Sequence, residues 1–280
     1  MATGADLAAK VEQGVAALTK AVGARPFPKT ALVLGSGLGP FADKVTSARD
    51  VSYRDIPGFP IPTVVGHSGK LRIGEVSGCS LAVLQGRFHA YEGHPPQEIG
   101  VPIRILRRMG VERLFLTNAA GSLRVDRPAG TLMAIEDHIN FAGLNPLVGP
   151  NDEKIGPRFP DMSHAYDPDL RAKLHAAAEK SGVTLASGVY VFVSGPNFET
   201  PAEIRMFGKM GADAVGMSTV PETLAAIHCG MKVIALSVMT NLAAGLSKTP
   251  LTHHETLQEA AKAHANVEKL LLQFFAGNHL

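Results

Sequence analysis

Arg87 and His89 are the first side chains in this sequence whose types and spacing suit chemistry. One residue separates them, so an extended backbone places both on one side and Phe88 on the other. A guanidinium offers a planar fork of donors to an oxyanion, and an imidazole adds a neighbouring donor. Two further histidines nearby, His67 and His94, weaken a purely structural interpretation. The pair therefore indicates an anion site.

A glycine-rich segment, Gly35-Ser-Gly-Leu-Gly39, offers backbone N–H groups and the hydroxyl of Ser36. The dinucleotide fingerprint needs glycine at the next position, where Pro40 stands, and no Gly-Lys-Ser/Thr follows for a Walker loop. Pro40 thus weakens the alternative of an NAD-linked oxidoreductase. The segment is either an anion-binding loop or only a tight strand-to-helix turn, and its residues leave both open.

Two later segments suit a planar, hydrogen-bonding ligand. An aromatic face such as Phe198 stacks on a base, and a carboxylate such as Glu199 accepts hydrogen bonds from ring N–H groups. The amide of Asn241, at the end of an apolar run, both donates and accepts. Structural alternatives exist: Glu199 suits the acidic start of a helix beginning at Pro201, and Asn241 suits a cap on the chain itself.

These side chains follow short apolar runs of strand length. The runs cover residues 31–34, 81–84, 114–116, 190–193, 212–215 and 233–236. Because they do not alternate with polar residues, they predict strands buried on both faces of a largely parallel α/β sheet. Ligands of such sheets bind beyond the carboxyl ends of the strands, so we expect one shared crevice.

Helical periodicity appears between and around these runs. Apolar residues recur at spacings of three and four over residues 7–22 and 257–274, and residues 99–107 and 202–210 suit crossover helices. Thr252 and Glu255 form a capping-box pattern before the last of these helices. Helices in these places would cover the sheet.

The composition excludes several classes of protein. The chain has 280 residues, of which 45% are hydrophobic. It contains 27 Lys and Arg residues and 25 Asp and Glu residues, so its net charge is +2 and it has no basic excess that would suit nucleic-acid binding. Cys79 and Cys229 lie far apart without a C-x-x-C partner, which disfavours a disulfide framework or a cysteine zinc site. The adjacent His253 and His254 do not form a helical metal pair. We expect a soluble, cytoplasmic protein without metal, membrane or nucleic-acid partners.

Taken in order, the polar segments resemble those of the trimeric, low-molecular-mass purine nucleoside phosphorylases. They are residues 35–39, 66–67, 86–93, 117–121, 149–152, 158–160, 194–200, 211–222 and 240–241. The resemblance implies one nucleoside phosphorylase-like domain over residues 1–280, a three-layer sandwich whose twisted, mixed but largely parallel sheet is flanked by helices. It also implies a cytoplasmic homotrimer in purine salvage. Such an enzyme needs no cofactor, because orthophosphate is itself a co-substrate. It reacts with inosine, guanosine or their 2′-deoxy forms to give the free base and ribose 1-phosphate or 2′-deoxyribose 1-phosphate.

The resemblance assigns roles to residues. Phosphate is bound by Ser36, His67, Arg87, His89, the backbone of Ala119, and Ser218. Ribose contacts Tyr91, Met217 and His253, and the base contacts Phe198, Glu199 and Asn241, while Phe159 is lent to the neighbouring subunit's site. The catalytic group comprises His89, Glu199, Asn241 and His253. A one-residue slip would exchange His253 for His254.

The same comparison predicts specificity. Asparagine at position 241, where family members acting on 6-aminopurines tend to carry aspartate, favours inosine and guanosine. A carboxylate at Glu199 also matches the N1–H of a 6-oxopurine and opposes the bare N1 of adenine. A methylthio-nucleoside phosphorylase would need a roomier apolar pocket at the sugar 5′ position, against which His253 argues. A non-catalytic nucleotide-binding module is the remaining alternative.

Overall fold

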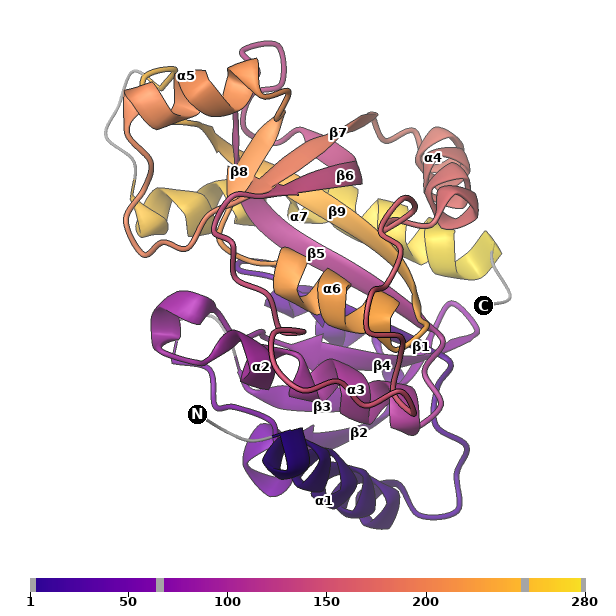
Figure 1. Cartoon of the computed structure of the whole chain (residues 1–280). Coiled ribbons are helices and arrows are strands. Elements are labelled where there is room, and N and C mark those ends of the chain that lie inside the picture. The colour runs from indigo at the N-terminus through magenta and orange to yellow at the C-terminus, as the bar shows by residue number, and fades with distance from the viewer. Residues whose placement is uncertain (1–3, 64–67, 248–251, 278–280) are drawn as a thin grey trace.

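The computed structural model describes residues 4–63, 68–247 and 252–277. Within them the chain forms a nine-stranded sheet in the order β2-β3-β4-β1-β5-β8-β7-β6-β9, with helices on both faces (Figure 1). The strands are β1 Thr30–Leu34, β2 Thr46–Ser52, β3 Lys70–Val76, β4 Cys79–Gln85, β5 Arg113–Ser122, β6 Leu132–Asn140, β7 Leu185–Phe192, β8 Ala214–Gly216 and β9 Lys232–Leu242. The helices are α1 Gly4–Val22, α2 Pro96–Ile99, α3 Val101–Arg108, α4 Pro168–Ser181, α5 Pro201–Lys209, α6 Val220–His228 and α7 His253–Gly277.

The centre of the sheet is parallel, as the unbroken apolar runs predict. β1 lies between β4 and β5 and pairs in parallel with both, and β5 also pairs in parallel with β9. All five residues of β1 are buried, which explains its lack of polar alternation. The carboxyl ends of these four strands therefore meet at one edge of the sheet.

Part of the sheet closes into a ring that the sequence did not reveal. β5 pairs with both β9 and β8, and the order β8-β7-β6-β9 returns to it. The link that closes the ring is short: Leu132, Met133 and Ala134 of β6 pair antiparallel with β9. The mixed, helix-flanked sheet is confirmed, with this closure as an additional feature.

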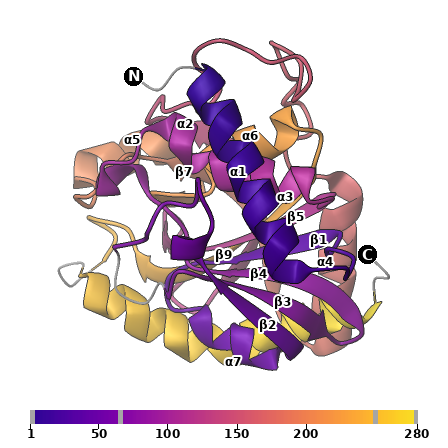
Figure 2. The same cartoon turned by 90° about the horizontal axis from the view of Figure 1, so that it is seen from below.

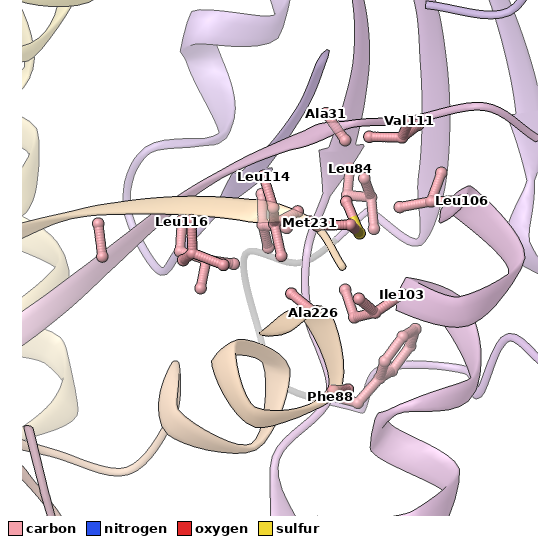
Figure 3. Packing of buried hydrophobic residues seen from close by; sticks show 14 of the residues in the cluster. Ala31, Leu84, Phe88, Ile103, Leu106, Val111, Leu114, Leu116, Ala226 and Met231 are labelled. Atoms are coloured by element: carbon pink, nitrogen blue, oxygen red, sulfur yellow. The ribbon is translucent and has the colours of Figure 1, made fainter. Parts of the chain in front are cut away.

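Successive residues of the central strands face opposite helical layers. Ala31 and Val33 belong to the cluster beneath α1, α3 and α6, and Leu32 and Leu34 belong to the cluster beneath α4 and α7. Figure 2 shows the strands between α1 on one side and α7 on the other. Figure 3 shows side chains of the first cluster, among them Leu84, Leu106, Leu114 and Ala226, from both strands and helices.

The predicted helices are present, with one interruption. α1, α5 and α7 occupy the expected ranges, whereas the crossover expected over residues 99–107 is divided into α2 and α3 at Gly100. A Cβ atom at Gly100 would lie 3.2 Å from the Ala225 Cβ and 3.3 Å from the Pro146 Cβ, so close packing requires a small residue there. No helix within the described ranges combines the length and apolar character needed to cross a membrane.

Candidate active site

A cavity of about 280 Å³ lies beyond the carboxyl ends of the central strands. It brings together most of the residues that the sequence analysis selected. Its lining includes Ser36, Arg87, His89, Tyr91, Ala119, Phe198, Glu199, Met217, Ser218 and Asn241. One shared crevice is therefore present where the strand ends predict it.

Arg87 follows β4 and is almost wholly buried, with 2% of its surface exposed. Its Nη1 donates to the Thr117 carbonyl oxygen at 2.6 Å and to the Ser218 Oγ at 3.2 Å. Its other edge faces the Glu222 carboxylate, with Nε 3.3 Å from Oε1 and Nη2 2.9 Å from Oε2. Phe88 lies in the core beside it, so the predicted alternation is confirmed. The guanidinium plane is thus fixed from two sides.

Glu222 belongs to the first turn of α6, whose N-cap is Thr219. The Thr219 backbone N–H donates to the Glu222 Oε2 at 3.2 Å, so one carboxylate both caps the helix and holds Arg87. Thr219 has a φ of 71°, a positive value that strains a β-branched residue. The tight turn places the Ser218 hydroxyl beside the Arg87 guanidinium. The sequence analysis missed Glu222, although the Thr-x-x-Glu spacing marks a capping box.

His89 is clamped by Glu92, three residues further along the chain. The His89 Nδ1 and the His89 backbone N both lie 2.9 Å from the Glu92 Oε1. Burial opposes ionisation of Glu92, but hydrogen bonds from His89 and Thr63 lower its pKa to about 2. Burial lowers the pKa of His89, despite Glu92. An ionised carboxylate can only accept a hydrogen bond, so we place the proton of the neutral His89 ring on Nδ1, where it donates to Glu92. This hydrogen bond orients the imidazole ring, which stacks on the ring of Tyr91.

Glu199 also lines the cavity and is 9% exposed. Burial raises the pKa of its carboxyl group. In the described part of the chain, no other residue donates a hydrogen bond to this carboxylate. The start of α5 is capped instead by Thr200 and Glu203, so the interpretation of Glu199 as a helix-starting acid does not hold. The carboxylate is left to accept from a ligand.

A β-bulge directs Asn241 into the cavity. Opposite β9, the register shifts between Ala120 and Gly121, so that Thr240 has no paired residue and both Thr240 and Asn241 line the cavity. The Asn241 Nδ2 donates to the Thr240 Oγ1 at 3.2 Å. A Cβ atom at Gly121 would lie 3.1 Å from the Asn241 Oδ1, so glycine gives the amide room. The sequence analysis missed Thr240, because a bulge leaves no clear mark in a single sequence.

The glycine-rich segment forms a tight turn after β1 and also borders the cavity. A Cβ atom at Gly35 would lie 2.7 Å from the Thr117 carbonyl oxygen and 2.9 Å from the Asn118 Cα. The Gly35 backbone N–H donates to the Thr117 Oγ1 at 3.0 Å, which ties the end of β1 to β5. Gly35 therefore serves close packing, while Ser36 lines the cavity.

Not every selected residue lies at this cavity. Phe159 is 87% exposed and is not among the cavity-lining residues, and Arg158 lies over its ring. His67 and the side chain of His253 lie outside the described residues, and His254 is exposed. Asn118 and Thr256 line the cavity without having been selected. Among the described residues, no cluster of three or more His, Cys, Asp or Glu could hold a metal ion.

Comparisons with known proteins identify the family of this chain. The family described as the phosphorylase superfamily matches residues 29–276. Purine nucleoside phosphorylase 1 of Bacillus subtilis (strain 168) is 48% identical over 244 residues, which cover 87% of this chain and 90% of that protein. The crystal structure of Schistosoma mansoni purine nucleoside phosphorylase in complex with inosine has a TM-score of 0.90 at 38% identity, covering 97% of each chain.

A second crystal structure of the Schistosoma mansoni enzyme, in complex with adenosine, has a TM-score of 0.87 at 38% identity. It covers 98% of this chain and 97% of that chain. The resemblance that the polar segments indicated is thus confirmed over most of the chain. The chain belongs to the phosphorylase superfamily and, within it, to the purine nucleoside phosphorylases, which are pentosyltransferases.

Proposed function

We propose that this enzyme cleaves 6-oxopurine nucleosides with orthophosphate, and that the described cavity is its active site. One observation supports this most strongly: a single cavity is lined both by oxyanion donors and by a buried carboxylate and an amide. Arg87 and Ser218 belong to the first group, and Glu199 and Asn241 to the second. In this proposal the first group holds the phosphate and the second group holds the base, on either side of the sugar.

At the phosphate end, the proposed ligands are Ser36, Arg87, His89, the backbone of Ala119, and Ser218, with His67 added from the resemblance. As the C1′–N9 bond breaks, positive charge develops on the sugar, as in glycoside cleavage. A phosphate oxygen forms the new bond to C1′, and the phosphate charge stabilises the developing cation. Because phosphate is the nucleophile, the protein needs neither a nucleophile of its own nor a metal for this step. The fixed Arg87 guanidinium serves to hold the nucleophile in line.

At the base end, the bonding electrons leave with N9 and spread over the purine ring. In this proposal the Asn241 amide donates to N7 and stabilises that charge, while Phe198 stacks on the ring. Glu199 accepts a hydrogen bond from N1–H of hypoxanthine or guanine. Adenine presents an unprotonated N1 to the same carboxylate, and two opposed acceptors disfavour it. A relative's structure with adenosine shows binding to that protein, so turnover is the quantity to measure here.

The ribose would lie between these ends, against Tyr91 and Met217, with His253 at its 5′ hydroxyl. Tyr91 and Met217 meet over Gly195, where a Cβ atom would overlap the Met217 Sδ and lie 3.2 Å from the Tyr91 Cδ1. The exposed Phe159 ring fits the proposal that a neighbouring subunit of a trimer uses it to close the site. Cys79 and Cys229 are both buried, and a reducing cytosol suits two such cysteines. The role in purine salvage is added from the resemblance.

The test follows inosine and adenosine absorbance with and without orthophosphate. We expect inosine cleavage only when phosphate is present, and a kcat/KM for adenosine at least about 10²-fold lower. Equal inosine cleavage in both conditions would mean hydrolysis and would refute the phosphate site. Adenosine turnover equal to that of inosine would refute only the base assignment. A thermal shift with inosine but no hypoxanthine release would leave a binding module.

A further inference from the structure

A second cavity, of about 830 Å³, lies away from the active site and shares no lining residue with it. It is bounded by α1, the segment before α3, and the loop of residues 146–155. Its walls include the apolar side chains of Leu7, Val11, Leu147 and Ile155. Arg104 of α3 and His228 of α6 also line it.

Arg104 is 9% exposed and has few partners for its five N–H donors. Its Nη2 donates to the Pro146 carbonyl oxygen at the long distance of 3.5 Å, and its Nε has no hydrogen-bond partner in the part of the chain that the structure describes. Among the described residues, no carboxylate forms an ion pair with this guanidinium. Arg104 is therefore a buried cation whose charge the described chain leaves uncompensated, an arrangement that is unfavourable without an anion.

The acidic residues that line the same cavity are already engaged. The Glu98 carboxylate lies 2.6 Å from the Lys10 Nζ, and the Asp152 Oδ1 accepts from the Lys154 backbone N–H at 2.9 Å. The Arg104 charge also acts on His228, because burial and the positive charge of Arg104 both lower the pKa of the His228 imidazole. Its Nε2 is held by the Asn151 Oδ1 at 3.1 Å. A negative group is what the site lacks.

We propose that this cavity is an oxyanion site, in which the Arg104 guanidinium binds a carboxylate or phosphate group. The planar fork of arginine suits either group, and the apolar walls strengthen the interaction by lowering the local dielectric. The group comes either from a free anion in solution or from a carboxylate of a second copy of this chain. The proposal does not depend on the assignment of the nucleoside site.

Two variants separate these sources. R104M removes the charge and keeps an unbranched stem, and R104K keeps the charge as a control. For a free anion, calorimetric titration with orthophosphate should show one more phosphate per chain in the wild type than in R104M. If the group is instead a carboxylate of a second copy, the wild type and R104M should bind the same number of phosphates per chain. In that case R104M should have a lower molar mass in light scattering than the wild type, and R104K should keep the molar mass of the wild type. In both cases we expect unchanged inosine phosphorolysis by R104M at its assembled concentration.

An equal phosphate count together with an equal molar mass in R104M and the wild type would overturn the proposal. A crystal of the wild type soaked in sulfate gives a test that needs no variant, in case R104M fails to fold. A sulfate or a neighbouring carboxylate within hydrogen-bond distance of the Arg104 guanidinium supports the proposal. Only water at that position overturns it.

Discussion

Replacing Glu222 by glutamine tests whether this carboxylate positions Arg87 for phosphate. Both partners of the pair are buried, with side-chain exposures of 1% and 7%. Glutamine preserves the shape and can still cap α6, but it leaves the Arg87 charge without its counter-ion. Removing one partner of a buried pair costs about 3–5 kcal/mol, so we expect the free energy of unfolding without phosphate to fall by at least about 3 kcal/mol.

The activity should fall for a geometric reason. Without the carboxylate at 2.9 Å and 3.3 Å, the guanidinium loses one of the two supports that fix its plane. Misplacement of a binding group by about 1 Å costs about 10²-fold in rate, so kcat/KM for phosphate in E222Q should fall by about that factor. The KM for inosine should stay unchanged, because Glu222 is not among the residues lining the cavity.

The chain supplies a matched control for this experiment. Glu203 occupies the same capping-box position in α5 as Glu222 does in α6. It is exposed, however, and within the described ranges it forms no ion pair with an arginine. E203Q should therefore change stability by well under about 1 kcal/mol and leave the phosphate dependence intact. If E222Q behaved like E203Q in urea unfolding and in phosphate titration, the positioning role would be wrong.

Three further predictions concern the base, the glycine-rich segment and acid stability. E199Q places an amide donor opposite the base N1, so the ratio of the kcat/KM for adenosine to that for inosine should rise by at least about 10²-fold. An unchanged ratio in steady-state assays would contradict the base assignment. G35A places a Cβ atom 2.7 Å from the Thr117 carbonyl oxygen, so the free energy of unfolding measured by thermal unfolding should fall by about 1–3 kcal/mol. A G35A variant as stable as the wild type would argue against close packing at this position. The lowered pKa of Glu92 stabilises the fold above its ordinary pKa of 4.5, and that contribution is lost as the pH falls through about 2. In urea unfolding at a series of acidic pH values, the free energy of unfolding of E92Q should fall less steeply with falling pH than that of the wild type. An equal fall in both proteins would refute the stabilising role of the Glu92 carboxylate.

The sequence was most informative where backbone geometry alone sets the outcome. Alternation along an extended segment placed Arg87 and His89 opposite Phe88, and the structure agrees. The unbroken apolar runs likewise predicted parallel strands, whose carboxyl ends lie at the same edge of the sheet. Both inferences need only local geometry and the rules of sheet topology.

The parts that escaped prediction depend on contacts between distant residues. The partner of Arg87 lies 135 positions further along the chain, and no local pattern joins Arg87 to Glu222. β6 reads Leu-Met-Ala-Ile-Glu-Asp-His-Ile-Asn, whose second half is polar, so the strand that closes the ring was not among the predicted runs. The bulge at Thr240 depends on how β5 and β9 align, which neither strand encodes by itself.

The central claim is that orthophosphate itself attacks the sugar, and oxygen-18 tests it most directly. The enzyme is supplied with inosine and orthophosphate labelled at all its oxygens, in unlabelled water, and the sugar product is analysed by mass spectrometry. We predict ribose 1-phosphate that retains every labelled oxygen, because the bond to C1′ forms from a phosphate oxygen and no P–O bond breaks. Unlabelled free ribose as the first product would show that water attacks C1′, and would contradict the proposed mechanism.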